Sequence, residues 1–215
     1  LFSDYNLWDI FFTTLIIAVL VTVIGTVIGT MGAVGLRKAK FPGKKLITDS
    51  IYFPIVIPEI VLAVAMLLMF NGAGVQLGIP TIVIGNVTLV LPYVYITVKA
   101  RLVGMDPSTE EASMDLGADR FYTFTHITMP EIMPGIIAGA FMSFSLVLDE
   151  LIITSFLTDA ETVTLPIKVY SMIKKGISPE INALTTIVFL AALLLVIMYL
   201  VVTDLVDKRK RKLAV

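Results

Sequence analysis

Three acidic side chains lie in stretches that are otherwise almost free of charge. Asp149 and Glu150 are adjacent near the end of one apolar segment, and Glu59 follows Pro58 in another. An ionised carboxylate at mid-membrane costs about 2.5–3.5 kcal/mol on insertion scales, so such groups usually face a partner, water or a pathway. The carboxylates of these three residues are therefore candidates for attracting a positively charged solute.

Helical geometry leaves alternatives open for each of these acids. Asp149 shares a face with Ser145, whereas Glu150 points about 100° away, so both carboxylates need not line one cavity. Both could instead lie at the outer interface or satisfy neighbouring polar groups. An unwound turn after Pro58 would let Glu59 reach a cavity, but Glu59 could also be an exposed acid at a helix break near the cytoplasmic interface.

A charged stretch from 106 to 130 predicts two short helices in a loop. Asp106 is a good N-cap and Pro107 suits the first helical position. Glu110 and Glu111 lie in the first turns, where carboxylates favour the helix dipole. Gly117 predicts the end of this first helix.

The second helix of the loop has a start signal, a periodic apolar face and a stop signal. Asp119 can cap it. Its apolar residues recur at helical spacing: Phe121, Phe124 and Ile127. Because Pro130 disfavours a helical conformation in the residue before it, we expect this helix to end near Thr128.

The elements that must position these residues are membrane spans. The chain has 215 residues, of which 57% are hydrophobic and 15% charged, whereas soluble domains have about 25% charged residues. We therefore expect an all-α integral membrane protein forming a single transmembrane domain. The predicted spans are 10–36, 51–70, 79–98, 132–157 and 181–203, with a charged loop at 99–131. In the first span, Gly25, Gly29 and Gly32 share a face and predict close helix packing.

Basic residues predict the orientation. Thirteen of the sixteen Lys and Arg residues lie in 37–50, in 99–131 and in the C-terminal tail. Because Lys and Arg accumulate on the cytoplasmic side, these segments should be inside. The N-terminal end would then be outside, although we find no signal peptide.

Other chemistry is poorly supported. The absence of cysteine excludes disulfides, Cys-ligated zinc and Fe–S clusters, and a single histidine argues against a His-based metal site. Gly43-Lys44-Lys45 is not a phosphate-binding loop, and no plausible catalytic Ser/His/Asp set exists. We therefore expect no catalytic residue, no metal and no cofactor in this chain. If the chain moves a solute across the membrane, the energy for that transport must come from another subunit or from an ion gradient.

The charged loop resembles a motif of ABC importer permeases, Glu-Ala-Ala…Gly…Ile-x-Leu-Pro. The matching residues are Glu111, Ala112, Ser113, Gly117, Ile127 and Pro130. Ser113 replaces the second Ala, and Met129 replaces the Leu. The resemblance implies a type I importer permease fold in which this loop forms a coupling helix that docks on an ATPase.

Further stretches look like the PotC-type permeases of spermidine/putrescine importers. They are Pro58-Glu59-Ile60, Asp149-Glu150, and 165–174 followed by 176–184. This resemblance implies an ATP-driven polyamine importer in the bacterial cytoplasmic membrane, with the C-terminus cytoplasmic and a further span before Leu1. It implies a PotB-like second permease, two copies of a PotA-like ATPase that carries ATP and Mg, and a PotD-like external binding protein.

A flexible polycation needs carboxylates and aromatic faces along its path. Asp149, Glu150 and Glu59 could supply the carboxylates, and Tyr93 and Tyr95 the aromatic faces. Two alternatives remain: an ABC permease for another solute, such as ferric ion, sulfate or thiamine, and an ion-coupled secondary transporter. The acids argue against an anion. A secondary transporter should show inverted repeats, and we find none.

Overall fold

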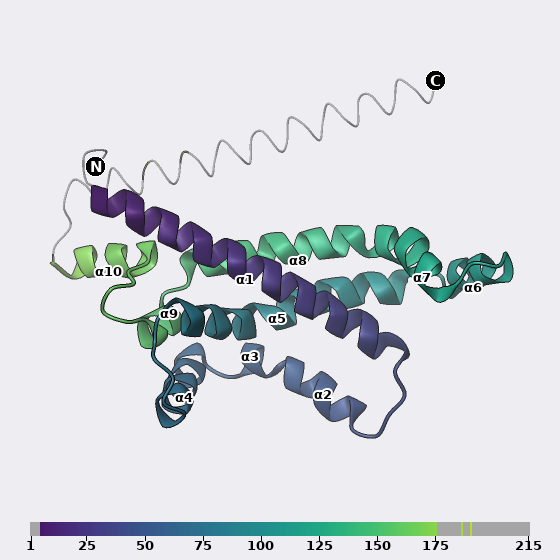
Figure 1. Ribbon diagram of the computed structural model, residues 1–215, viewed down its shortest axis with the longest axis horizontal. Helices are drawn as coiled ribbons and strands as arrows, with labels where there is room; N and C mark the ends of the chain where they lie inside the picture. Colours follow the sequence, from purple (N-terminus) through teal and green to yellow (C-terminus); the bar gives the residue numbers. More distant parts are fainter. Residues whose placement is uncertain (1–4, 176–185, 187–189, 191–215) are drawn as a thin grey trace. The chain divides into compact units, whose positions relative to one another are not determined.

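The structure is a computed structural model that describes residues 5–175 together with 186 and 190. Every regular element among these residues is helical, which confirms the all-α prediction (Figure 1). In chain order they are α1 (Tyr5–Lys38), α2 (Lys44–Ile51), α3 (Phe53–Val56), α4 (Glu59–Gly72), α5 (Ile79–Gly104), α6 (Pro107–Asp115), α7 (Arg120–Thr123), the π-helix η1 (Phe124–Thr128), α8 (Met129–Asp149), α9 (Ile152–Leu157) and α10 (Leu165–Lys175). Apart from residues 186 and 190, the predicted span 181–203 lies outside the described residues, and so does the basic tail.

The chain divides into two compact units. The larger one, Trp8–Ile167, contains nearly all the described helices. The other comprises Leu1–Leu7 and Lys168–Val215, and its described residues belong mainly to α10. There the ammonium of Lys174 lies 4.6 Å from the ring centroid of Tyr170, a cation–π contact.

Three described helices are long and apolar enough to cross a membrane: Leu7–Arg37, Ile79–Gly104 and Arg120–Asp149. The first of them, α1, approaches α5 very closely. A Cβ atom added at Gly25 would lie 2.8 Å from Val90, and one at Gly29 would lie 2.8 Å from Val94. Only glycine allows this approach, which confirms the predicted close packing at Gly25 and Gly29. At Gly32 a Cβ would lie 3.8 Å from Tyr95, an ordinary contact distance.

Helix α5 is the centre of the larger unit. Its residues Ile82, Val90 and Val98 are fully buried, and α8 lies alongside it (Figure 1). The two helices also approach through a glycine, because a Cβ at Gly139 would lie 2.7 Å from Thr97 Oγ1. Helix α5 is thereby held by α1 and α8 and forms the framework for the elements at its two ends.

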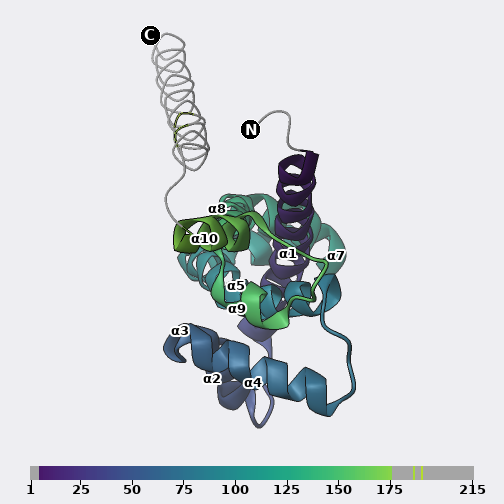
Figure 2. The same ribbon diagram turned by 90° about the vertical axis from the view of Figure 1, so that its left-hand side faces the viewer.

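The second predicted span, 51–70, is not one helix. It is divided among the end of α2, α3 and α4, because the chain is extended at Ile57 (φ −77°, ψ 133°) before Pro58. Pro58 disfavours a helical conformation in the residue before it, which explains the break. Helix α4 has 14 residues and runs across the direction of the long helices (Figures 1 and 2).

The predicted helix end near Thr128 is wrong. Residues 124–128 form the π-helix η1, and the helix continues without a break into α8. Pro130 is the second residue of α8. A π-helical turn widens the backbone spacing, so it can accommodate a proline ring and a missing N–H that an uninterrupted α-helix would not.

The fourth predicted span, 132–157, is also interrupted. Helix α8 ends at Asp149, Glu150 is extended (ψ 119°), and α9 begins at Ile152. The interruption lies directly at the acidic pair that the sequence singles out. It allows the two adjacent carboxylates to differ completely in their surroundings.

Candidate functional site

Helix α6 is capped at its start by the residues that the sequence predicts. Asp106 Oδ1 accepts a hydrogen bond of 2.9 Å from the Ser108 N–H, and Pro107 is the first helical residue. This bond to the ionised form lowers the pKa of the Asp106 carboxyl below its ordinary value. The cap satisfies one of the free N–H groups at the start of the helix.

Gly117 ends the same helix in the left-handed conformation, with φ +92°. The Gly117 N–H donates to the Met114 carbonyl at 2.9 Å, and the Ala118 N–H donates to the Ser113 carbonyl at 3.2 Å. This pair of bonds is the Schellman arrangement. The helix therefore stops abruptly and the chain turns directly toward α7.

The residues of the ABC permease motif cluster at this turn. Four of them, Ala112, Ser113, Gly117 and Ile127, line one open concavity of about 870 Å³. The Ser113 hydroxyl lies 3.1 Å from the Thr123 hydroxyl, which joins α6 to α7. The other two, Glu111 and Pro130, are exposed and do not line this concavity.

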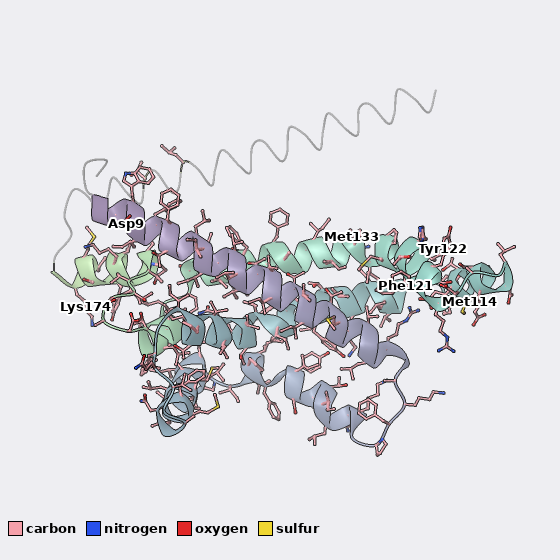
Figure 3. All side chains as sticks on the ribbon, in the orientation of Figure 1. Asp9, Met114, Phe121, Tyr122, Met133 and Lys174 are labelled. Carbon is pink, nitrogen blue, oxygen red and sulfur yellow. The ribbon has the colours of Figure 1, made fainter. Side chains whose placement is uncertain are left out.

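Large apolar side chains are exposed around the same turn, and sequence reasoning assigned them no role. Leu116 is 90% exposed and Phe121 is 76% exposed. Met114, Phe121 and Tyr122 project from the end of the larger unit that α6 and α7 form (Figure 3). Tyr122 is stacked on His126 with ring centroids 4.0 Å apart. Exposed apolar groups gathered around an open concavity are typical of a protein interaction surface.

Sequence reasoning missed the partner of Glu110. The preceding residue in the motif region, Glu110, is 5% exposed, and Arg37 Nη1 donates to its Oε1 at 2.8 Å. Thr128 donates to the same oxygen at 2.7 Å. These residues come from α1, α6 and η1, so no local sequence pattern could indicate the contact.

At the far end of α8, the structure brings together two of the three predicted pathway acids. The carboxyl groups of Glu59 and Glu150 lie close enough to each other for their charges to interact. Glu59 is the first residue of α4, and Glu150 directly precedes α9. Helices α4 and α9 pack together, so the contact results from two separate helix starts.

The Glu150 side chain also accepts hydrogen bonds from the first turn of α9, whose N-cap residue is Leu151. Glu150 Oε1 accepts from the Ile153 N–H at 2.5 Å, and its Oε2 accepts from the Thr154 N–H at 2.8 Å and from the Thr154 hydroxyl. Glu150 thus accepts hydrogen bonds from neighbouring polar groups, as one of the two sequence-based alternatives expects, and its place in a pathway stays a prediction. The neighbouring Glu59 carboxyl nevertheless leaves two acidic groups in contact.

Asp149 lies outside this arrangement. It is the last residue of α8 and is exposed, as is Ser145 on the same face. The structure thus separates the two adjacent acids, Asp149 and Glu150, and pairs the second with Glu59.

The two predicted aromatic residues differ as well. Tyr95 is 3% exposed and packs edge-to-face on Tyr52, with centroids 5.8 Å apart. The ammonium of Lys99 lies 5.3 Å from the Tyr95 centroid and 3.1 Å from the Tyr52 hydroxyl. An internal cation therefore already occupies the Tyr95 face, whereas Tyr93 is half-buried.

In residues 5–175, 186 and 190, no group of three or more His, Cys, Asp or Glu side chains is placed to hold a metal ion. The paired carboxyls belong to only two residues. The chemistry that the described sites support is therefore the attraction of a cation by Glu59 and Glu150, and contact with another protein at α6 and α7.

Comparison with known proteins gives the class and then the family. A crystal structure of an amino acid ABC transporter shares the fold, with a TM-score of 0.66, 16% identity and 86% of each chain covered. The molecule is thus an all-α membrane protein with an ABC transporter permease fold. The family described as "Binding-protein-dependent transport system inner membrane component" matches residues 25–212. The chain belongs to that family.

Curated relatives include polyamine permeases. The spermidine/putrescine permease PotC of Escherichia coli K12 is 39% identical over 168 residues, covering 78% of this chain and 64% of the relative. PotC of Haemophilus influenzae is 34% identical over 171 residues, covering 80% and 66%. The putrescine permease PotI of Escherichia coli K12 is 39% identical over 166 residues, covering 74% and 59%. The chain therefore spans less than two thirds of the length of these relatives.

Proposed function

We propose that this chain is the membrane-spanning permease subunit of an ATP-driven importer for polyamines such as spermidine and putrescine. The observation that carries the proposal is the closeness of the Glu59 and Glu150 carboxyl groups at the packed starts of α4 and α9, in a chain whose relatives include polyamine permeases. The protein would form half of a translocation pathway. Its partners would be a PotB-like permease, two PotA-like ATPases that bind ATP and Mg, and a PotD-like binding protein outside.

The carboxyl pair suits a cationic substrate for an electrostatic reason. Two neighbouring carboxylates repel each other, and this repulsion strengthens as the dielectric constant falls. Among the described residues, neither Glu59 nor Glu150 forms a salt bridge. An ammonium group placed between the two carboxyls would replace the repulsion with attraction. Asp149 would lie at the edge of this pathway, and Tyr93 could contribute an aromatic face.

The loop around α6 would be the coupling element. Glu111 is exposed on α6, and Gly117 allows the sharp exit into the concavity lined by Ala112, Ser113 and Ile127. A short preformed helix ending in a tight turn suits docking into a groove of an ATPase. Exposed Leu116 and Phe121 would supply apolar contact area on that surface.

A reconstituted complex tests the function. The full-length chain would be purified with its partner permease, ATPase and binding protein, and placed in proteoliposomes. We expect ATP-dependent uptake of radiolabelled spermidine. Unlabelled putrescine should inhibit this uptake by competition, whereas ferric ion should not. Uptake of ferric ion, or uptake without any ATPase, would contradict the proposal.

Cysteine labelling tests the orientation. A cysteine at Gly74 would be strained, because Gly74 has φ +68°. The exposed residue Gln76 is therefore the labelling site in the outer turn, and exposed Lys40 is the site in the basic loop. With the C-terminus cytoplasmic, a membrane-impermeant maleimide should label Gln76→Cys in intact cells. It should label Lys40→Cys only after the membrane is opened. The reverse pattern would place α6 outside and remove it from ATPase coupling.

A further inference from the structure

A charged contact joins the end of α1 to α6. Arg37 Nη1 lies 2.8 Å from Glu110 Oε1, and the Glu110 side chain is 6% exposed. Arg37 also lies 3.9 Å from the Met105 sulfur, at the junction between α5 and α6. The guanidinium is thus held where the first span, the third span and the loop meet.

The same carboxylate oxygen also receives a hydrogen bond from the other side of the loop. Thr128 Oγ1 donates to Glu110 Oε1 at 2.7 Å, and Thr128 is 4% exposed. Thr128 ends η1 and directly precedes α8. A single side chain of α6 is therefore bonded to α1 and to the start of α8. We call Arg37, Glu110 and Thr128 the clasp.

The clasp borders a cavity rather than a packed core. A cavity of about 440 Å³ is lined by Val34, Arg37, Glu110 and Thr128, together with Leu102, Met114, Arg120, Thr123 and Phe124. Apolar packing across this space is incomplete, so polar contacts contribute more to the position of α6. Because Glu110 is buried and Arg37 is only partly exposed, neutralising one partner of this ion pair leaves the other charge largely uncompensated, which is unfavourable.

We infer that Glu110 is a positioning residue that makes α6 move as one body with α1 and the start of α8. Its neighbour Glu111 is exposed on α6, so the two adjacent acids have different tasks. Glu111 faces outward for a partner, whereas Glu110 faces inward and transmits a displacement of α6 to the spans. The inference rests on the proposed function only in naming an ATPase as the source of that displacement.

The first test measures coupling in the reconstituted full complex. Glu110→Gln keeps the size of the side chain and removes its charge. We expect the ATPase to remain bound and spermidine transported per ATP hydrolysed to fall at least about fivefold, the lower end of the range for coupling between sites. Combining Arg37→Glu with Glu110→Arg should restore coupling above either single change.

The matched control is Glu131→Gln, which removes an exposed carboxylate from the first turn of α8. It should leave the ratio of transport to hydrolysis unchanged. Equal loss in both variants, or normal coupling per assembled Glu110→Gln complex with only a lower yield, would overturn the inference. The second result would mean that the clasp serves folding alone.

An independent readout does not require transport. Amide hydrogen exchange of residues 107–116 would be measured in the assembled complex without nucleotide. Because the clasp holds α6 to two spans, Glu110→Gln should accelerate exchange there at least about fivefold, with little change in 79–98. If amide exchange of residues 107–116 is unchanged in Glu110→Gln, the inference about the clasp is wrong, even if the complex transports spermidine. If the complex without any substitution shows no ATP-dependent uptake, the proposed function is contradicted, while accelerated exchange in Glu110→Gln would still support the clasp.

Discussion

Two glutamates in this molecule are equally buried but have opposite kinds of neighbour. Glu110 and Glu150 are each 5% exposed. Glu110 pairs with a guanidinium supplied by α1, whereas Glu150 lies against a second carboxyl, that of Glu59. A buried charge that is paired inside the protein is suited to holding parts together. A buried acid beside another acid is suited to meeting a cation from outside.

This comparison predicts its largest effect at the carboxyl pair. Changing Glu59 and Glu150 together to Gln removes both charges and keeps similar volumes. Truncating one partner of a close charge pair costs about 2 kcal/mol or more, so uptake of spermidine per assembled complex should fall about 30-fold or more. The measurement is initial uptake normalised to complex in proteoliposomes. Unchanged normalised uptake in the double variant would remove both acids from the pathway.

The next effect concerns the turn that ends α6. Gly117→Val forces a β-branched residue into a conformation with φ +92°, which costs about 1–2 kcal/mol or distorts the turn. We expect hydrolysis by the ATPase to respond about tenfold less to loaded binding protein. Gly104→Val is the control, because Gly104 ends α5 without a positive φ and has open space around it. Normal stimulation in Gly117→Val would refute the docking assignment.

Asp149 should matter less than Glu150, although the two are adjacent. Asp149 is exposed and is separated from the carboxyl pair by the end of α8. We expect Asp149→Asn to change normalised spermidine uptake by less than about threefold, whereas Glu150→Gln should lower it more. The same proteoliposome measurement compares the two. A larger loss for Asp149→Asn would reverse the ranking and place the pathway on the other side of α8.

The smallest effect is the pH dependence of the α6 cap. The pKa of Asp106 is lowered in the folded protein by the hydrogen bond from Ser108. The cap therefore contributes its full stabilisation above the ordinary Asp pKa of about 4, and loses it as the pH falls through the lowered value. Amide exchange of 107–116, divided at each pH by that of Asp106→Asn, should be constant near neutrality and rise in acid. A constant ratio throughout would contradict this role.

The features that the sequence predicts correctly are local. The caps Asp106 and Asp119, the first-turn Pro107 and the left-handed Gly117 depend on residues within one helical turn, so their types indicate their structure. The all-α class is also predicted correctly, because long apolar stretches with few charges indicate membrane-spanning helices. Close packing at Gly25 and Gly29 is also readable, because small residues four apart share a helix face.

The features that the sequence could not indicate depend on contacts between distant segments. Arg37 and Glu110 meet only because the end of α1 lies beside the first turn of α6. The pair of Glu59 and Glu150 requires two helix breaks to coincide. The incorrect helix end at Thr128 has a different cause. The usual effect of Pro130 was overridden by a π-helical turn, which has no sequence signature of its own.

Helix α8 has one buried glutamate contact at each of its ends. Thr128, bonded to Glu110, directly precedes it, and Glu150 directly follows it. Its 21 residues correspond to about 30 Å, so a tilt of about 5° displaces one end by about 3 Å relative to the other. That is roughly the length of a hydrogen bond. A tilt of α8 by a few degrees, started at the α6 end, would therefore suffice to bring the Glu59 and Glu150 carboxyl groups together or to separate them.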